Sequence, residues 1–151
     1  MPVFLPGETL PASKLNQMGI IAQQRFTADE AAAHSVTGLS DMVINNVPVI
    51  AGDTYQIHLH TRVQTSAATC TWAVECFLNG AMIGEFGTVV NETAGVNIPV
   101  VDGTVYWDAP TTQATDDFTV NLREITGTAT VTLTASATAP RWLTIINAGE
   151  F

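Results

Sequence analysis

Hydrophobic and polar residues alternate along most of this chain with a period of two, which is the pattern of half-buried β-strands. Between Asp117 and Arg123 the apolar positions are Phe118, Val120 and Leu122. The alternation returns between Thr130 and Thr138, where Val131, Leu133, Ala135 and Ala137 alternate with hydroxyl side chains. Gly127 lies between the two runs and supplies the positive φ of a tight turn. Asp117–Pro140 is therefore predicted to be a β-hairpin, which Pro140 ends.

The same pattern predicts strands over most of the remaining chain. They are expected at IIAQQRFT, HSVTGLS, MVINNVPVI, TYQIHLHTRVQT, TCTWAVECFL, AMIGEFGTVV, IPVVDGTVYWDAP and RWLTIINAGEF. Asn79-Gly80 is a strong hairpin signal, a second turn is expected at Asp102-Gly103, and Pro48 moves its strand to a sheet edge. About eight to ten strands with hardly any helix predict an all-β fold, an antiparallel β-sandwich that is jelly-roll-like.

Residues 1–19 differ from the rest and are predicted to form an extended arm with a short helix, ahead of a β-sandwich domain over residues 20–151. Pro11 stands near the first position of the helix and Gly19 just past its end. Two turns of helix are not stable alone, so the apolar side chains need a surface to pack on. The arm either folds back on its own domain or docks on another subunit. The candidate docking residues are Val3, Phe4, Leu5, Leu10, Leu15 and Met18.

Composition narrows the class of partner. Charged residues make up 13% of the chain and apolar residues 46%, so Thr, Ser, Asn, Gln and Ala must cover much of the surface. Such a surface suits a protein that is packed against neighbours. The formal net charge of −9, with only five Lys and Arg, argues against nucleic acid as a direct partner. We expect no secretion signal and no membrane span.

The two cysteines are expected to be thiols. Cys70 and Cys76 lie six residues apart on one face of a predicted strand, which separates them by roughly 20 Å, too far for a disulfide. Two small buried thiols fit a protein that assembles in a reducing cytoplasm. Trp72, between them on the same face, is expected in the core.

Candidate catalytic and metal-binding residues are few. His58 and His60 share one strand face about 7 Å apart, close enough to share a metal, but an exposed strand face explains them equally and no third ligand is evident. Their protonation below about pH 6.5 would alter a subunit contact. The acidic pairs Asp29-Glu30 and Asp116-Asp117 lie beside turns, where carboxylates are usually solvated. With no catalytic motif in the sequence, we expect no enzyme activity and no cofactor.

Hydroxyl and aromatic side chains offer alternative binding surfaces. The threonines between Thr128 and Thr138 are predicted to form a flat hydroxyl face, which either binds sugar or reflects the β-propensity of threonine on a solvated strand. Tyr106, Trp107 and Trp142 are candidate exposed aromatic contacts, either as sugar platforms or as interface anchors.

From end to end, the chain resembles a family of small virion proteins of tailed bacteriophages, especially those that infect actinobacteria. GETLPASKLNQM resembles the leader of those proteins, with the matching positions Gly7, Leu10, Leu15 and Asn16. IIAQQRFTADEAAAHSVTGLSDMVINNVPVIAGDTYQIHLHTRV resembles their first strands, and TATVTLTASATAPRWLTIINAGEF resembles their ending. The relatives place an acidic pair before the final Gly, whereas here Asn147-Ala148 precede Gly149.

The resemblance implies a β-sandwich displayed on the outer capsid surface of a virion that is assembled in the bacterial host cytoplasm. It implies a capsid decoration protein whose partners are the major capsid protein and further copies of itself, as a homotrimer. Similar chains are also described as tail-associated or fibre proteins, which leaves host-surface glycan binding as the alternative function. A metal-dependent enzyme that uses His58 and His60 is the third hypothesis.

Overall fold

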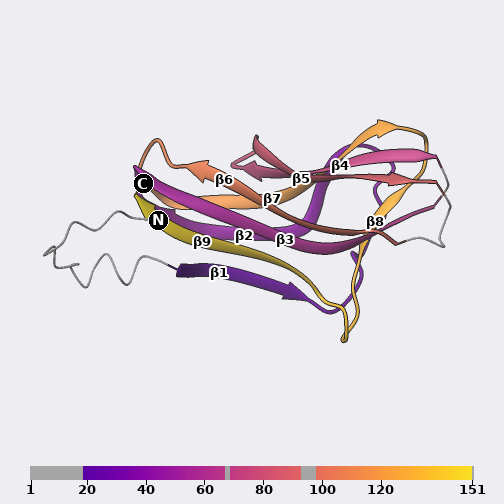
Figure 1. Ribbon diagram of the computed structural model, residues 1–151, viewed down its shortest axis with the longest axis horizontal. Coiled ribbons are helices and arrows are strands. Elements are labelled where there is room, and N and C mark those ends of the chain that lie inside the picture. Colours follow the sequence, from indigo (N-terminus) through magenta and orange to yellow (C-terminus); the bar gives the residue numbers. More distant parts are fainter. Residues whose placement is uncertain (1–18, 67–68, 93–97, 151) are drawn as a thin grey trace, which may run out of the picture.

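The computed structural model describes residues 19–66, 69–92 and 98–150 of the chain. Within these residues the fold is all-β and consists of two antiparallel sheets packed face to face (Figure 1). The predicted arm and helix, with their six candidate docking residues, lie outside the described residues. In the described part of the chain, no helix is long and apolar enough to cross a membrane.

Nine strands are present in the described residues. They are β1 (Gly19–Phe26), β2 (Gly38–Val49), β3 (Asp53–Thr65), β4 (Cys70–Leu78), β5 (Ala81–Asn91), β6 (Val100–Asp108), β7 (Gln113–Thr126), β8 (Val131–Thr134) and β9 (Arg141–Glu150). Sheet A has the order β1-β9-β3-β6, with β8 also paired to β3, and sheet B has the order β2-β7-β4-β5.

The connections make this sandwich a jelly roll. β1 to β4 alternate between the two sheets, β4 and β5 form a hairpin within sheet B, and β6, β7 and β8 alternate again. Antiparallel strands that cross repeatedly between two sheets are the arrangement of the jelly roll. The predicted fold class is therefore confirmed.

The core lies between the sheets and is filled by alternate residues of each strand. In β3 the side chains of Tyr55, Ile57, Leu59 and Val63 are fully buried, as the alternation predicts. Trp72 in β4 is also fully buried and packs among them, which confirms its predicted place. Cys70 and Cys76 are buried thiols, as expected from their spacing.

The predicted hairpin at Asp117–Pro140 is wrong. β7 pairs with β2 and β4 in sheet B, whereas β8 pairs with β3 in sheet A, so the chain crosses from one sheet to the other at Gly127. Strand β8 also ends at Thr134, and the row of threonines does not continue as one strand face. Alternation correctly predicted the buried positions Phe118, Val120 and Leu122 of β7 and Val131 and Leu133 of β8, but not the end of β8 at Thr134. It holds no information on which strand is the partner.

Two other turn predictions have opposite outcomes. Asn79 and Gly80 join β4 to β5 with φ of 48° and 83°, the two positive values that a two-residue hairpin of this kind requires. Asp102 and Gly103, in contrast, lie inside β6, which pairs without interruption with β3. Gly103 is needed there because the backbone of Phe86 in β5 passes close to its Cα. Pro48 lies on β2, an edge strand, as predicted.

Candidate functional site

The outer face of sheet A collects most of the candidate residues. Strand pairing places them in three rows that run across β1, β9, β3 and β6. The rows are Ile20, Ile146, Gln56 and Tyr106; then Gln23, Thr144, His58 and Thr104; then Arg25, Trp142, His60 and Asp102. We call this surface, with the neighbouring Arg62 and Asp108, the outer A face.

At the centre of the outer A face, one carboxylate bridges two imidazoles. His58 Nε2 lies 2.6 Å from Asp102 Oδ1, and His60 Nδ1 lies 2.9 Å from Asp102 Oδ2. These hydrogen bonds, first that of His58 and then that of His60, hold the pKa of Asp102 below its usual value. The sequence did not connect Asp102 with the histidines because it was assigned to a turn, whereas the register of β6 places it opposite His60.

A metal site at these histidines gains no support from the geometry. Within the described residues, no group of three or more His, Cys, Asp or Glu side chains is arranged to hold a metal ion. His60 instead stacks on Trp142, with ring centroids 4.1 Å apart and planes at 10°. The cluster is therefore a hydrogen-bonded and stacked surface feature of sheet A.

The three candidate aromatic residues have different environments. Tyr106 is 66% exposed on the outer A face. Trp142 is half-buried beside His60. Trp107 points to the interior and contacts the rings of Tyr55 and Phe118, at centroid distances of 5.9 Å and 6.1 Å. The structure thus brings Tyr106 and Trp142 onto one face and directs Trp107 to the core.

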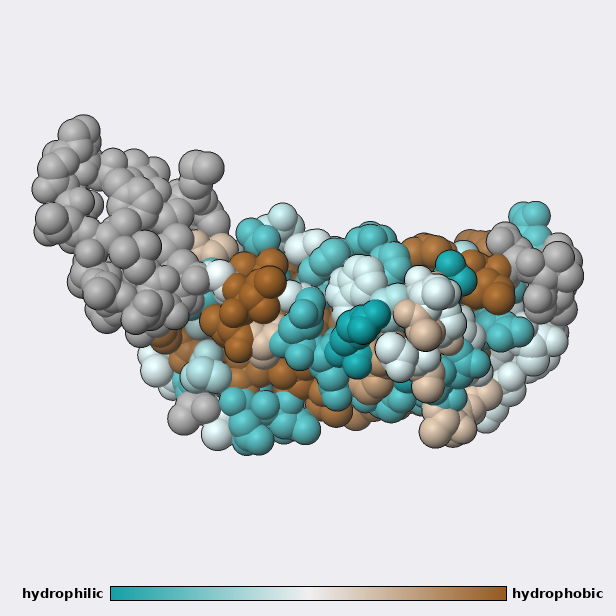
Figure 2. Space-filling model, turned by 90° about the horizontal axis from the view of Figure 1, so that it is seen from below, coloured by the Kyte–Doolittle hydropathy of each residue, from teal (hydrophilic) through white to brown (hydrophobic). Residues whose placement is uncertain are grey.

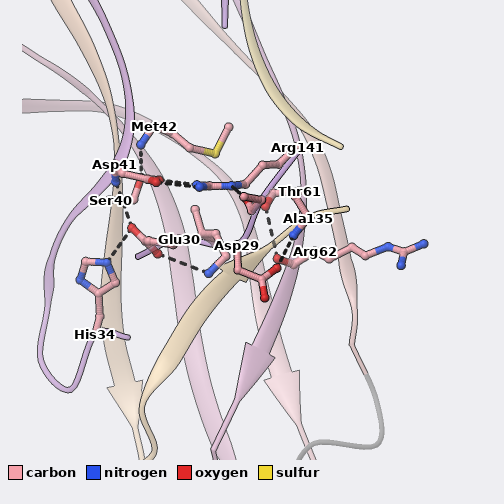
Figure 3. A network of polar contacts seen from close by, with 12 residues as sticks. Asp29, Glu30, His34, Ser40, Asp41, Met42, Thr61, Arg62, Ala135 and Arg141 are labelled. Carbon is pink, nitrogen blue, oxygen red and sulfur yellow. Dashed lines mark hydrogen bonds and ion pairs between the residues drawn. The ribbon is translucent and has the colours of Figure 1, made fainter. Parts of the chain in front are cut away.

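A second polar cluster fixes the loop between β1 and β2 (Figure 3). Arg141, at the start of β9, is only 1% exposed, and its guanidinium forms a two-pronged ion pair with Asp41 of β2. The same guanidinium lies 4.4 Å from the ring centroid of Phe26 and donates to the carbonyl oxygen of Ala28. One buried cation thus joins a strand of each sheet to the loop.

Glu30 continues this network, contrary to the expectation that it is solvated. It is 8% exposed, accepts a hydrogen bond from the backbone N–H of Asp41, and lies 2.8 Å from His34 Nε2 (Figure 3). The backbone N–H of Leu133 also donates to it. The expectation was wrong because the loop folds onto β8, where a carboxylate is needed to accept backbone donors.

Asp116 departs from the same expectation. It is fully buried and accepts a hydrogen bond of 2.7 Å from the side chain of Asn79. Its neighbour Asp117 is exposed, and its carboxylate accepts a hydrogen bond from the backbone N–H of Asn46. The Asp116 carboxylate therefore holds the turn between β4 and β5, whereas the Asp117 carboxylate holds an irregularity in the pairing of β2 with β7.

Comparison with known proteins adds little to this geometry. No protein-family model matches the chain, and neither does any curated protein sequence. Among solved structures, the insecticidal delta-endotoxin Cry8Ea1 from Bacillus thuringiensis is similar over 76% of this chain and 19% of its own, at 15% identity and a TM-score of 0.47. The VP2 subviral particle of infectious bursal disease virus is similar over 83% of this chain and 33% of its own, at 10% identity and a TM-score of 0.44.

A further structure, of the Gx strain of that virus, is similar over 86% of this chain and 35% of its own, at 12% identity and a TM-score of 0.42. The chain thus spans about a fifth to about a third of the solved chains that it matches. Likenesses of this degree carry no argument about function. The class of the protein, a jelly-roll β-sandwich, is defined by its own strand order.

Proposed function

We propose that this protein is a structural component of a bacteriophage virion, a capsid decoration protein that binds the outer surface of the major capsid lattice and stabilises the shell. The observation that carries the proposal is the surface of the sandwich. Large apolar side chains are exposed at Ile20, Val36, Leu39, Met82, Val90, Ile98, Val100, Tyr106 and Ile125. Figure 2 shows hydrophobic areas between hydrophilic ones on one face. Such a surface suits contacts with neighbouring subunits.

The sequence resemblance to small phage virion proteins supports the same function, because it covers both the leader and the closing strand. Binding to the assembled shell at equilibrium stabilises it, since the new interfaces must break before capsid subunits separate. Each apolar side chain of the leader that becomes buried contributes about 1.5–3 kcal/mol before ordering costs. We propose three copies at each symmetry axis of the shell, attached through the six candidate docking residues of the N-terminal arm. The function requires no cofactor and no chemical step.

Binding to particles that lack the protein tests this function. The full chain is added to such particles, and cosedimentation, the temperature of shell disruption and a cryo-EM reconstruction are measured. We expect density at symmetry axes of the shell and a higher disruption temperature. Density confined to the tail, or no binding to shells, would contradict the proposal.

Substitution in the N-terminal arm, residues 1–19, tests the mode of attachment. Phe4→Ser with Leu5→Ser should weaken shell binding, because both changes remove apolar area from the proposed contact. Val90→Ser is the matched control, since Val90 is a 60% exposed apolar residue of β5. Equal binding by the leader variant and the control would exclude attachment through the leader.

Recognition of host-surface glycan is the second candidate. It is favoured by one observation, the exposed ring of Tyr106 on the same face as the stacked Trp142 and His60. Aromatic faces beside polar groups suit sugar rings. If this function is correct, the protein should bind a glycan on an array, and Tyr106→Ala should abolish that binding. An array without any binding would exclude this candidate function.

A further inference from the structure

The outer A face differs from the rest of the molecule in charge. The whole chain has 14 acidic residues and a net charge of −9. Among the described side chains, the outer A face carries Asp102 and Asp108 as its acids, and Arg25 and Arg62 as its bases. The formal charges of these four side chains sum to zero. Two copies of an acidic protein repel one another least where such neutral surfaces meet.

The outer A face also carries exposed apolar area. Ile20 is 65% exposed and Tyr106 66% exposed, and Ile146 lies between them in the same row. The stacked pair of Trp142 and His60 stands two rows away. Aromatic and aliphatic side chains without net charge are the composition of the buried centre of a protein interface.

We propose that copies of this chain associate into a homo-oligomer through the outer A face. In this arrangement the outer A face of each copy is directed toward the symmetry axis and toward the neighbouring copies. The occupant of the face is a second copy, because the chain as a whole is strongly acidic, whereas this face carries equal numbers of acids and arginines and exposes Ile20 and Tyr106. Four strands about 4.8 Å apart and about 30 Å long give a face of roughly 600 Å² before side-chain relief is counted. That approaches the roughly 800 Å² per partner of a stable interface.

Sedimentation velocity of the full chain tests the surface. At about pH 7.5 we expect a concentration-dependent oligomer, and Ile20→Ser with Tyr106→Ser should weaken it at least tenfold. The matched control is Met82→Ser with Val90→Ser, which removes apolar side chains that are 51% and 60% exposed on β5 of sheet B. A monomer at all concentrations, or equal weakening by the control, would overturn the proposal.

The inference uses the proposed trimer only for the number of copies. Particle binding is measured separately, so the failure of one proposal is distinguishable from the failure of the other.

Discussion

Gly103 of β6 lies directly against the backbone of Phe86 in β5, where the edges of the two sheets meet. A Cβ at Gly103 would come closer than 3.0 Å to the carbonyl oxygen of Phe86, a distance that real Cβ atoms do not adopt. The glycine is thus needed for the approach of two backbones inside a regular pair of strands. It closes the sandwich on the side of β5 and β6.

Substituting this glycine tests the contact. Gly103→Ala should lower the free energy of unfolding by about 3 kcal/mol, because backbone must move to admit the methyl group. Gly87→Ala is the control: its Cβ would meet only a methyl group of Val101 at 3.6 Å, and its φ is not in the left-handed region. Urea denaturation of both variants gives the comparison. Equal stability of the two would contradict this packing.

The ion pair of Arg141 and Asp41 provides a second test. Asp41→Ala leaves the buried guanidinium without its carboxylate and should destabilise the protein by about 3 kcal/mol. Arg141→Met in the same background should recover part of the loss, because the uncompensated charge is then removed. A double-mutant cycle from denaturation curves measures the coupling. Additive effects would show that the pair is not coupled.

The neighbouring aromatic residues of β6 should respond differently. Trp107→Ala removes ring contacts with Tyr55 and Phe118 and should cost about 3 kcal/mol. Tyr106→Ala, at a position 66% exposed, should change the stability of the monomer by less than about 0.5 kcal/mol. Thermal and urea unfolding at low protein concentration distinguish the two. A destabilising Tyr106→Ala would contradict the assignment of inner and outer positions.

The cysteines should be unreactive in the folded protein. Burial raises the pKa of the Cys76 thiol to about 12, so almost no thiolate exists at pH 8. Cys70 is 1% exposed, which denies reagents access. A chromogenic disulfide reagent should titrate no thiol in the native protein and both after denaturation. Rapid reaction of a native thiol would show that β4 opens to solvent.

The bridge of Asp102 to the two histidines should contribute to stability above about pH 4. Its pKa is lower in the folded protein than the value of about 3.9 for an unfolded chain, so the contribution is present above that value and is lost as the pH falls through the folded pKa. The carboxylate is largely exposed, so Asp102→Asn should cost less than about 1 kcal/mol at pH 7. The urea midpoints of the wild type and of Asp102→Asn should differ at pH 7 and should be equal at pH 2.5. A constant difference would exclude an ionic contribution.

Local patterns predicted the elements of this structure well. The alternation of Tyr55, Ile57 and Leu59 predicted both a strand and its inner face, and Asn79-Gly80 predicted a hairpin, because each signal acts between neighbouring residues. Pro48 predicted an edge for the same reason, since it lacks a donor. The sequence likewise supplied the candidate residues Tyr106 and Trp142, although not their shared face.

The partners of each strand were decided by tertiary structure. Residue types and their alternation are sufficient to predict an all-β chain, the inner and outer positions of most of its strand residues, its acidic charge and its thiols. Only the fold decided that β7 and β8 belong to opposite sheets, that Gly103 is a contact and not a turn, and that Asp102 meets His58 and His60. The physical reason is that pairing between distant strands depends on how two whole sheets bury their apolar faces, which no local period encodes.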